Sequence, residues 1–190
     1  MIETRTTFGC FGGECAISVL AEGPVRDVVD LQRARLLAWH DRFTCFDARS
    51  ELMGFNADPR EVVPASADLR RFAAAVAWAH ALSGGLVDAT LDSAVVKPHA
   101  TLPLRLALRL APPRRPARGR ALPRIRVDDA TVRRPPGLRL DSGGLAKGLF
   151  ADLVARALAG HAAVAVDCAG DVRVTGMSRP VAVADPFGGP

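Results

Sequence analysis

Hydrophobic and polar residues along the chain follow the periods of both strands and helices. Residues 14–21 (ECAISVLA) are apolar and rich in strand formers, and the glycine-punctuated stretch before them favours a strand or hairpin. Residues 25–41 and 148–160 carry apolar residues at roughly helical spacing, so each segment is predicted to form an amphipathic helix. The apolar positions in these two segments are Val28, Val29, Leu31, Leu36, Leu37, Trp39, Leu149, Phe150, Leu153, Val154, Ala157 and Leu158.

A further helix is predicted between these two. Asp68 can cap its start, the helix continues to about Ser83, and the glycine pair 84–85 ends it. Residues 42–59 mix aromatic and polar residues and finish at a proline, which favours an ordered loop. The face of this helix that is expected to be buried consists of Leu69, Phe72, Ala73, Val76 and Ala79.

The last third of the chain is richer in strand patterns. Residues 124–128 and 131–141 are predicted to be two strands around an Asp-Asp turn. Two more strands, 162–167 and 172–176, flank a short turn, and 180–186 resembles another strand. Because strands and helices are mixed without regular strand-helix-strand alternation, the predicted fold class is α+β.

The composition is that of one globular domain. The 190 residues are 49% hydrophobic and can bury one sizeable core, so a single domain over 1–190 is expected. The sequence shows no long uncharged apolar run and no signal-peptide pattern, which predicts a cytoplasmic protein with no membrane span. The four cysteines form no C-x-x-C pair and share no metal-ligand spacing with the four histidines, so reduced, mostly buried thiols are expected.

The net charge of +5 is concentrated in one Arg/Pro-rich segment, residues 105–139. This segment has eleven arginines against two aspartates and contains no aromatic residue. Nucleic-acid surfaces usually provide aromatic stacking groups or a docking element. A solvated connection is therefore the favoured interpretation, with a nucleic-acid-binding arm as the alternative, and no nucleic-acid partner is predicted.

The segment 141–152 (DSGGLAKGLFAD) joins the end of a predicted strand, a glycine turn and the start of a helix. Free N–H groups and the positive end of the helix would point to one place, which favours an anion site. The spacing matches neither a P-loop nor a dinucleotide-binding G-x-G-x-x-G motif. Lys147 would oppose the helix dipole near the first turn, so it either points to solvent or contacts a bound anion.

Acidic residues near the glycines also permit two interpretations. Asp141 can bind a hydroxyl or ring nitrogen of a ligand, or it can cap the turn that follows it. Asp88, Asp167 and Asp171 have the same two possibilities. Several acids near glycine turns suggest a phosphate site that also holds Mg²⁺, because Mg²⁺ prefers a few oxygen ligands together with the phosphates of a substrate.

Five segments, from about residue 6 to 190, resemble those of one family in the family's order. Residues 42–56 (RFTCFDARSELMGFN) resemble the R-F-x-x-F-D-x-x-S-E-L-x-x-x-N segment of the ApbE family, the FAD:protein FMN transferases. Residues 140–152 (LDSGGLAKGLFAD) resemble the family's Asp-x-Gly-Gly/Ala-Ile-Ala-Lys-Gly signature. The other similar segments are GGLVDATL, VDCAGDVRVTG and VAVADP.

The resemblance implies an ApbE-like (T-fold-like) mixed sheet with packed helices, incomplete at the C-terminus. It also implies an enzyme that uses FAD and Mg²⁺ to attach FMN covalently to a threonine or serine of an acceptor flavoprotein, with release of AMP. By the same resemblance, Asp141 and Lys147 contact FAD, and the backbone carbonyl of Gly144 is a Mg²⁺ ligand. No catalytic residue is assigned. The further FAD-contacting positions that the resemblance implies are Phe8, Phe46, Leu86, Val87 and Asp88.

The sequence departs from the family pattern at several positions. Phe8 replaces a methionine, Val87 replaces an aromatic residue, and Ala89 replaces a proline. A Cys-Ala pair at 168–169 stands in a glycine region. Family members continue beyond the position of Pro190 with a segment whose aspartate and threonine complete the Mg²⁺ site, and this sequence has no counterpart of it. Two interpretations are therefore open: an active transferase, or a flavin-binding module that is truncated or catalytically impaired.

Overall fold

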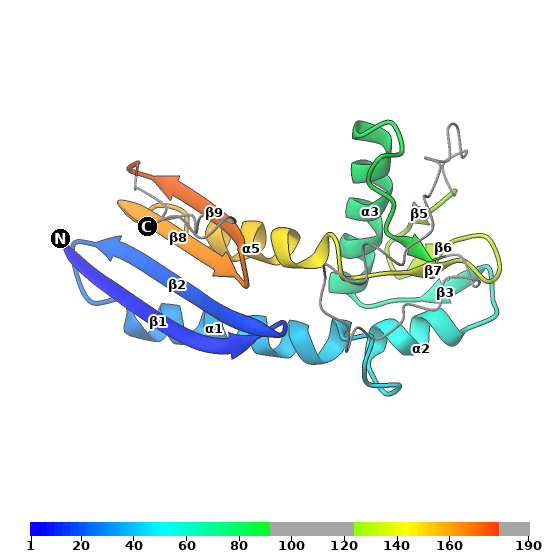
Figure 1. Ribbon diagram of the computed structural model, residues 1–190, viewed down its shortest axis with the longest axis horizontal. Helices are drawn as coiled ribbons and strands as arrows, with labels where there is room; N and C mark the ends of the chain where they lie inside the picture. Colours follow the sequence, from blue (N-terminus) through cyan, green and yellow to red (C-terminus); the bar gives the residue numbers. More distant parts are fainter. Residues whose placement is uncertain (92–123, 179–190) are drawn as a thin grey trace, which may run out of the picture. The chain divides into compact units, whose positions relative to one another are not determined.

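The structure, a computed structural model, describes residues 1–91 and 124–178 (Figure 1). Its antiparallel sheets and packed helices confirm the predicted α+β class. Contacts divide the chain into two compact units, which we describe separately. Unit 1 comprises the described residues of 1–41 and 146–190, and unit 2 comprises those of 42–145. The expectation of a single domain stays a prediction.

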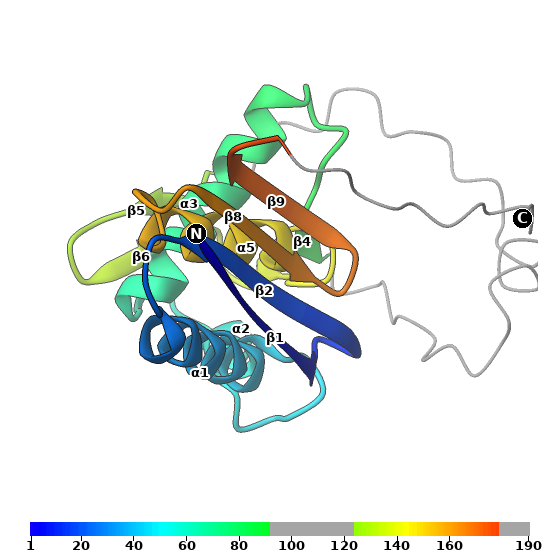
Figure 2. The same ribbon diagram turned by 90° about the vertical axis from the view of Figure 1, so that its left-hand side faces the viewer.

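Unit 1 is built on a four-stranded antiparallel sheet with the strand order β1-β2-β8-β9 (Figure 2). Its strands are β1 (Ile2–Cys10), β2 (Gly13–Ala21), β8 (Ala163–Cys168) and β9 (Asp171–Gly176). Two-residue turns join β1 to β2 and β8 to β9. Both residues of each turn have a positive φ, namely Phe11 (54°), Gly12 (78°), Ala169 (53°) and Gly170 (98°). This geometry matches the twist of antiparallel hairpins, and both predicted strand patterns are confirmed.

Two helices pack in unit 1, namely α1 (Arg26–Phe43), whose last two residues already belong to unit 2, and α5 (Ala146–Ala157). Helix α5 lies against β8 and β9, and the Cys10 thiol of β1 donates to the carbonyl of Leu36 in α1. Trp39 of α1 stacks on Phe150 of α5 with ring centroids 4.7 Å apart. Burial of these side chains stabilises the unit. Other buried residues of unit 1 include Cys15, Ile17, Val19, Val29, Val154, Val164, Val166 and Cys168.

Both helices of unit 1 confirm predicted segments, and α1 buries only part of the apolar positions in its pattern. Val28 and Leu31 are 39% and 64% exposed. Gln32 is buried in their place. Val29, Gln32 and Leu36 have the i, i+3, i+7 spacing of one helix face. Gln32 is therefore buried because of its position on that face, although its side chain is polar.

Unit 2 contains two helices and two small antiparallel sheets, with strand orders β3-β6-β5 and β4-β7, among its described residues. Its elements are α2 (Glu51–Ala57), β3 (Val62–Pro64), α3 (Ala67–Leu82), β4 (Thr90–Leu91), β5 (Arg126–Val127), β6 (Thr131–Arg133) and β7 (Arg139–Leu140). All five residues expected on the buried face of α3 are buried. In the part of the chain that the structure describes, no helix combines the length and apolar character needed to cross a membrane.

Helix α2 lies where residues 42–59 were expected to form a loop, so that prediction was wrong. The Ser50 hydroxyl accepts the N–H of Met53 at 3.1 Å and caps the helix. Leu52 and Phe55 are buried, and this packing supports a helix too short to be stable alone. Seven residues make too few turns for apolar spacing to distinguish a helix from an ordered loop.

The start of α3 also differs from the prediction, because Ser66 and not Asp68 caps it. The Ser66 hydroxyl accepts the N–H of Leu69 at 3.2 Å. Asp68 instead forms ion pairs with Arg42 at 2.8 Å and with Arg71 at 3.1 Å. The predicted end of the helix is confirmed, since both glycines that follow it have positive φ.

Residues 131–141 were expected to form one strand, but a turn at Gly137 (φ 77°) divides them into β6 and β7. Strand β6 pairs with β3 and β5, whereas β7 pairs with β4. The strand expected at 180–186 lies outside the described residues, and so do residues 105–123 of the Arg/Pro-rich segment.

Arg42 connects the first turns of the two helices of unit 2. Its guanidinium pairs with Glu51 at 2.6 Å and Asp68 at 2.8 Å, and it donates to the Ser66 hydroxyl at 2.7 Å. Burial lowers the pKa of Arg42, but hydrogen bonds to Glu51 and Asp68 and their charges outweigh burial and raise it overall. The network therefore holds a carboxylate in the first turn of each helix, where negative charge is favourable.

Three of the four cysteines, Cys10, Cys15 and Cys168, are buried free thiols of unit 1. Burial raises the pKa of Cys10 to about 12 and also raises that of Cys168 well above its usual range. Cys45, in unit 2, is a free thiol with intermediate exposure. The expectation of mostly buried thiols is therefore confirmed, and their reduced state stays a prediction.

We predict that only Cys45 reacts rapidly with Ellman's reagent in the native protein at neutral pH. The thiolate is the reactive form, and burial of the other three thiols opposes both its formation and access of the reagent. Release of the coloured thiolate product should show one fast thiol per chain, and the other three should react on addition of denaturant. Cys45→Ser should remove the fast phase. A fast phase that persists in this variant would contradict the buried arrangement.

Candidate functional site

The glycine loop, residues 141–145, begins at the end of strand β7 in unit 2. The N–H of Asp141 donates to the carbonyl of Ala89 at 2.8 Å. The Asp141 carboxylate accepts the N–H of Gly143 at 3.0 Å. Asp141 therefore caps the turn that follows it, which is one of the two roles expected for it.

Two side chains hold this strand and loop from outside. Asn56 of α2 is buried, and its amide donates to the carbonyl of Leu140 and accepts the N–H of Leu140, each at 2.8 Å. The Ser142 hydroxyl donates to the carbonyl of Phe43 at 2.9 Å. These bonds join residues far apart in sequence, so the position of the loop depends on tertiary structure and not only on its own turn.

The predicted FAD-contacting triplet, residues 86–88, lies beside the glycine loop because β4 pairs with β7. Thr90 is the ladder partner of Leu140. The carboxylate of the triplet's aspartate accepts the N–H of Thr90 at 2.9 Å and its hydroxyl at 2.6 Å. The triplet's leucine and valine are 86% and 40% exposed. The triplet thus directly precedes Ala89, whose carbonyl accepts the N–H of Asp141.

Phe46, a predicted flavin contact, is 77% exposed in the loop before α2. Its N–H donates to the Thr44 hydroxyl at 3.2 Å. The Thr44 carbonyl in turn accepts the hydroxyl of Ser50 at 2.7 Å. Because Ser50 also caps α2, the loop that carries Phe46 is anchored to the helix that carries Asn56.

Gly144 is exposed in the turn of the glycine loop, with open space where a Cβ atom would lie. Its carbonyl oxygen can supply one ligand to Mg²⁺. Within residues 1–91 and 124–178, however, no three His, Cys, Asp or Glu side chains form a group that could hold a metal ion. A magnesium ion at this loop would therefore be held by the Gly144 carbonyl together with phosphate oxygens of a bound ligand and water.

Lys147 is the second residue of α5 and belongs to unit 1. Its ammonium group pairs with the Asp171 carboxylate at 3.2 Å and donates to the carbonyl of Ala169 at 3.2 Å. Its side chain is 30% exposed. Lys147 therefore does not simply point to solvent: the turn between β8 and β9 holds it, and Asp171 offsets its unfavourable interaction with the helix dipole.

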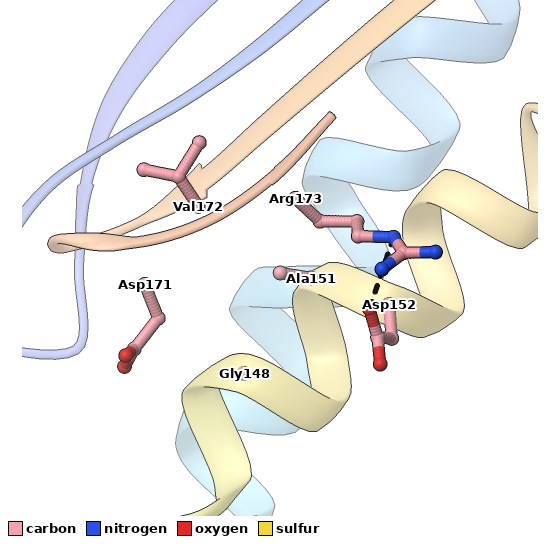
Figure 3. A pocket seen from close by; sticks show the side chains of 6 residues that line it. All are labelled: Gly148, Ala151, Asp152, Asp171, Val172 and Arg173. Atoms are coloured by element: carbon pink, nitrogen blue, oxygen red, sulfur yellow. Dashed lines mark ion pairs between the residues drawn. The ribbon is translucent and has the colours of Figure 1, made fainter. Parts of the chain in front are cut away.

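A cavity of about 240 Å³ lies next to this ion pair, between α5 and β9. Figure 3 shows Arg173 paired with Asp152 there, at 3.4 Å. Asp171, which binds Lys147, also lines the cavity. The cavity is therefore charged and adjoins the predicted FAD contact of unit 1. Its lining residues are Gly148, Ala151, Asp152, Asp171, Val172 and Arg173.

Phe8 is buried in β1 of unit 1, opposite Cys15 of β2. The guanidinium of Arg33 lies over its ring, 5.5 Å from the ring centroid. The ring is thus packed against the protein itself and exposes little surface.

Sequence reasoning singled out Asp141 and Lys147 but missed Asn56. The signal for it was available, since Asn56 matches the final asparagine of the R-F-x-x-F-D-x-x-S-E-L-x-x-x-N segment. It also left the partner of Lys147 unidentified, because the pairing with Asp171 depends on where the second hairpin lies. The predicted site residues fall in both units. Unit 1 contains Phe8 and Lys147, and unit 2 contains Phe46, Leu86, Val87, Asp88, Asp141 and Gly144.

Three solved structures from other organisms have the same fold. The flavinyl transferase ApbE of Pseudomonas stutzeri, in its apo form, is 20% identical, with a TM-score of 0.68 over 100% of this chain and 59% of that chain. The flavin transferase ApbE of Vibrio cholerae is 18% identical, with a TM-score of 0.67 over 94% and 60% of the two chains. The ApbE protein of Thermotoga maritima is 17% identical, with a TM-score of 0.62 over 87% and 59%.

The family is identified by the sequence and not by these distant structures. The chain spans about three fifths of the length of each similar structure, and at such identities the similarity shows the fold alone. No curated protein sequence matches the chain. The model of the ApbE family, however, matches residues 11–189. Because this match covers nearly the whole chain, the protein belongs to the ApbE family.

Proposed function

We propose that this protein is an FAD:protein FMN transferase, which attaches FMN from FAD to a threonine or serine of an acceptor flavoprotein and releases AMP, with Mg²⁺ as cofactor. The observation that carries the proposal is the glycine loop, where Asp141 lies beside the exposed triplet 86–88. Membership of the ApbE family supports it, as do the names of the P. stutzeri and V. cholerae proteins, which are flavin transferases.

In the proposed reaction, the acceptor's hydroxyl oxygen attacks the phosphorus atom of the FMN half of FAD. A P–O bond forms to the threonine or serine, the P–O bond to AMP breaks, and the hydroxyl proton is released. Such transfers depend mainly on the position of the reacting groups and on stabilisation of charge on the phosphoryl oxygens. When bound, Mg²⁺ supplies part of that stabilisation.

The side chains of the proposed site have different tasks. Asp141 binds a hydroxyl or ring nitrogen of FAD, and Lys147 binds an anionic phosphate oxygen. Phe46 and the apolar pair 86–87 offer exposed apolar surface to the flavin ring. The carbonyl of Gly144 remains the metal ligand that the family resemblance implies. These tasks separate recognition of the flavin from recognition of the diphosphate.

Covalent transfer tests the proposal directly. The full chain is incubated with FAD, Mg²⁺ and an acceptor flavoprotein, and the acceptor is then examined for flavin fluorescence on a denaturing gel. We expect a fluorescent acceptor band that disappears when the target threonine or serine is replaced by alanine. A dark acceptor beside a fluorescent control made with a longer ApbE protein would contradict transfer. Quenching of FAD fluorescence without a band would instead identify a flavin-binding module.

Lys147→Met is expected to raise the dissociation constant for FAD about tenfold or more, because a hydrogen bond to a charged group contributes about 1.5–3 kcal/mol. Arg156→Met is the matched control, since it removes one positive charge from the exposed last turn of the same helix. It should leave the dissociation constant within about twofold. Fluorescence titrations at low and high salt measure both variants. Equal losses would assign the effect to net charge and contradict a contact by Lys147.

A further inference from the structure

Asn56 is a buried polar side chain that contacts the strand before the glycine loop. It is 8% exposed and lies on α2 beside the buried Leu52 and Phe55. Both of its hydrogen bonds, each 2.8 Å long, are made with the backbone of Leu140. A buried amide is unfavourable unless it is hydrogen-bonded, and here the bonds go to the residue that precedes Asp141.

These two bonds take the place of a missing strand partner. Strand β4 pairs with one edge of β7, where the N–H of Asp141 donates to Ala89. N–H groups of successive strand residues point to opposite edges, so the N–H and carbonyl of Leu140 face away from β4. Asn56 satisfies both groups from that other edge. Strand β7 is therefore held on two sides just before Asp141.

We propose that Asn56 is a positioning residue for FAD binding: its amide fixes the backbone of Leu140 and so places the Asp141 carboxylate. This inference rests on the proposed function. The hydrogen bond from the N–H of Gly143 orients only the side chain of Asp141. Asn56 instead fixes the backbone of Leu140, the residue to which the backbone of Asp141 is joined. Small displacements of a binding group have large effects, since about 1 Å can cost about a hundredfold in rate.

The amide group suits this position for a chemical reason. Leu140 presents one N–H donor and one carbonyl acceptor, and an amide offers the complementary acceptor and donor. Aspartate keeps an acceptor for the N–H but loses the donor and places negative charge beside the carbonyl. Serine is too short to reach both groups. Either replacement leaves at least one buried backbone group of Leu140 without its partner.

The test compares FAD dissociation constants of the full chain and three variants by fluorescence quenching, at a temperature where circular dichroism shows all of them folded. Leu69→Ala is the matched control, because Leu69 is buried in α3 of the same unit and takes no part in the Leu140 bonds. We expect Asn56→Asp and Asn56→Ser to raise the constant about tenfold, and Leu69→Ala to change it less than about twofold. If Asn56→Asp does not fold, Asn56→Ser carries the comparison.

A double-mutant comparison separates positioning from a general loss of stability. Because Asn56 acts through Asp141, Asn56→Asp should change the dissociation constant less than about twofold in an Asp141→Asn background. The proposal would be overturned if Asn56→Asp raised the FAD dissociation constant by the same factor with and without Asp141→Asn. It would also be overturned if the Asn56 variants bound FAD as tightly as the wild-type chain. In both cases the wild-type chain still binds FAD, and the proposed function stands. A wild-type chain that binds no FAD would overturn both proposals.

Discussion

One side-chain amide determines where the glycine loop begins. Asn56 and Leu140 are 84 residues apart in sequence, and the two bonds between them pair both backbone hydrogen-bonding groups of Leu140. Buried backbone groups need such partners. Strand β7 has only two residues, so its ladder with β4 alone offers few bonds to hold it. Asp141 follows directly, and its position therefore depends on this contact.

The contact in turn depends on a helix that is too short to be stable alone. Helix α2 presents Asn56 because Ser50 caps its start and Arg42 binds Glu51 in its first turn. Ser50 and the Arg42–Glu51 pair thus stabilise α2, and Arg42 also joins it to the start of α3. Asp171 has a comparable role in unit 1. Its carboxylate, on strand β9, pairs with the ammonium group of Lys147 on helix α5 and so holds that side chain in place.

Sequence patterns predicted the elements whose hydrophobic pattern extends over many consecutive residues or whose strands are joined by short turns. Helix α3 has 16 residues, enough turns for its buried face to be predicted correctly, and the strands joined by short turns were also recognised. Helix α2 was missed because seven residues give too few turns. The pairing of Thr90 with Leu140 and of Lys147 with Asp171 could not be predicted, because tertiary structure alone brings these residues together. The family resemblance pointed to site residues, but not to the contacts that position them.

The central claim is that the glycine loop and Lys147 bind FAD. The most direct test is an FAD titration of the ¹⁵N-labelled chain, followed through the backbone amide signals by NMR. We expect the amides of Asp141, Gly143 and Lys147 and those of residues 86–88 to shift together with one dissociation constant. Shifts confined to other residues, or no shift at saturating FAD, would contradict the claim.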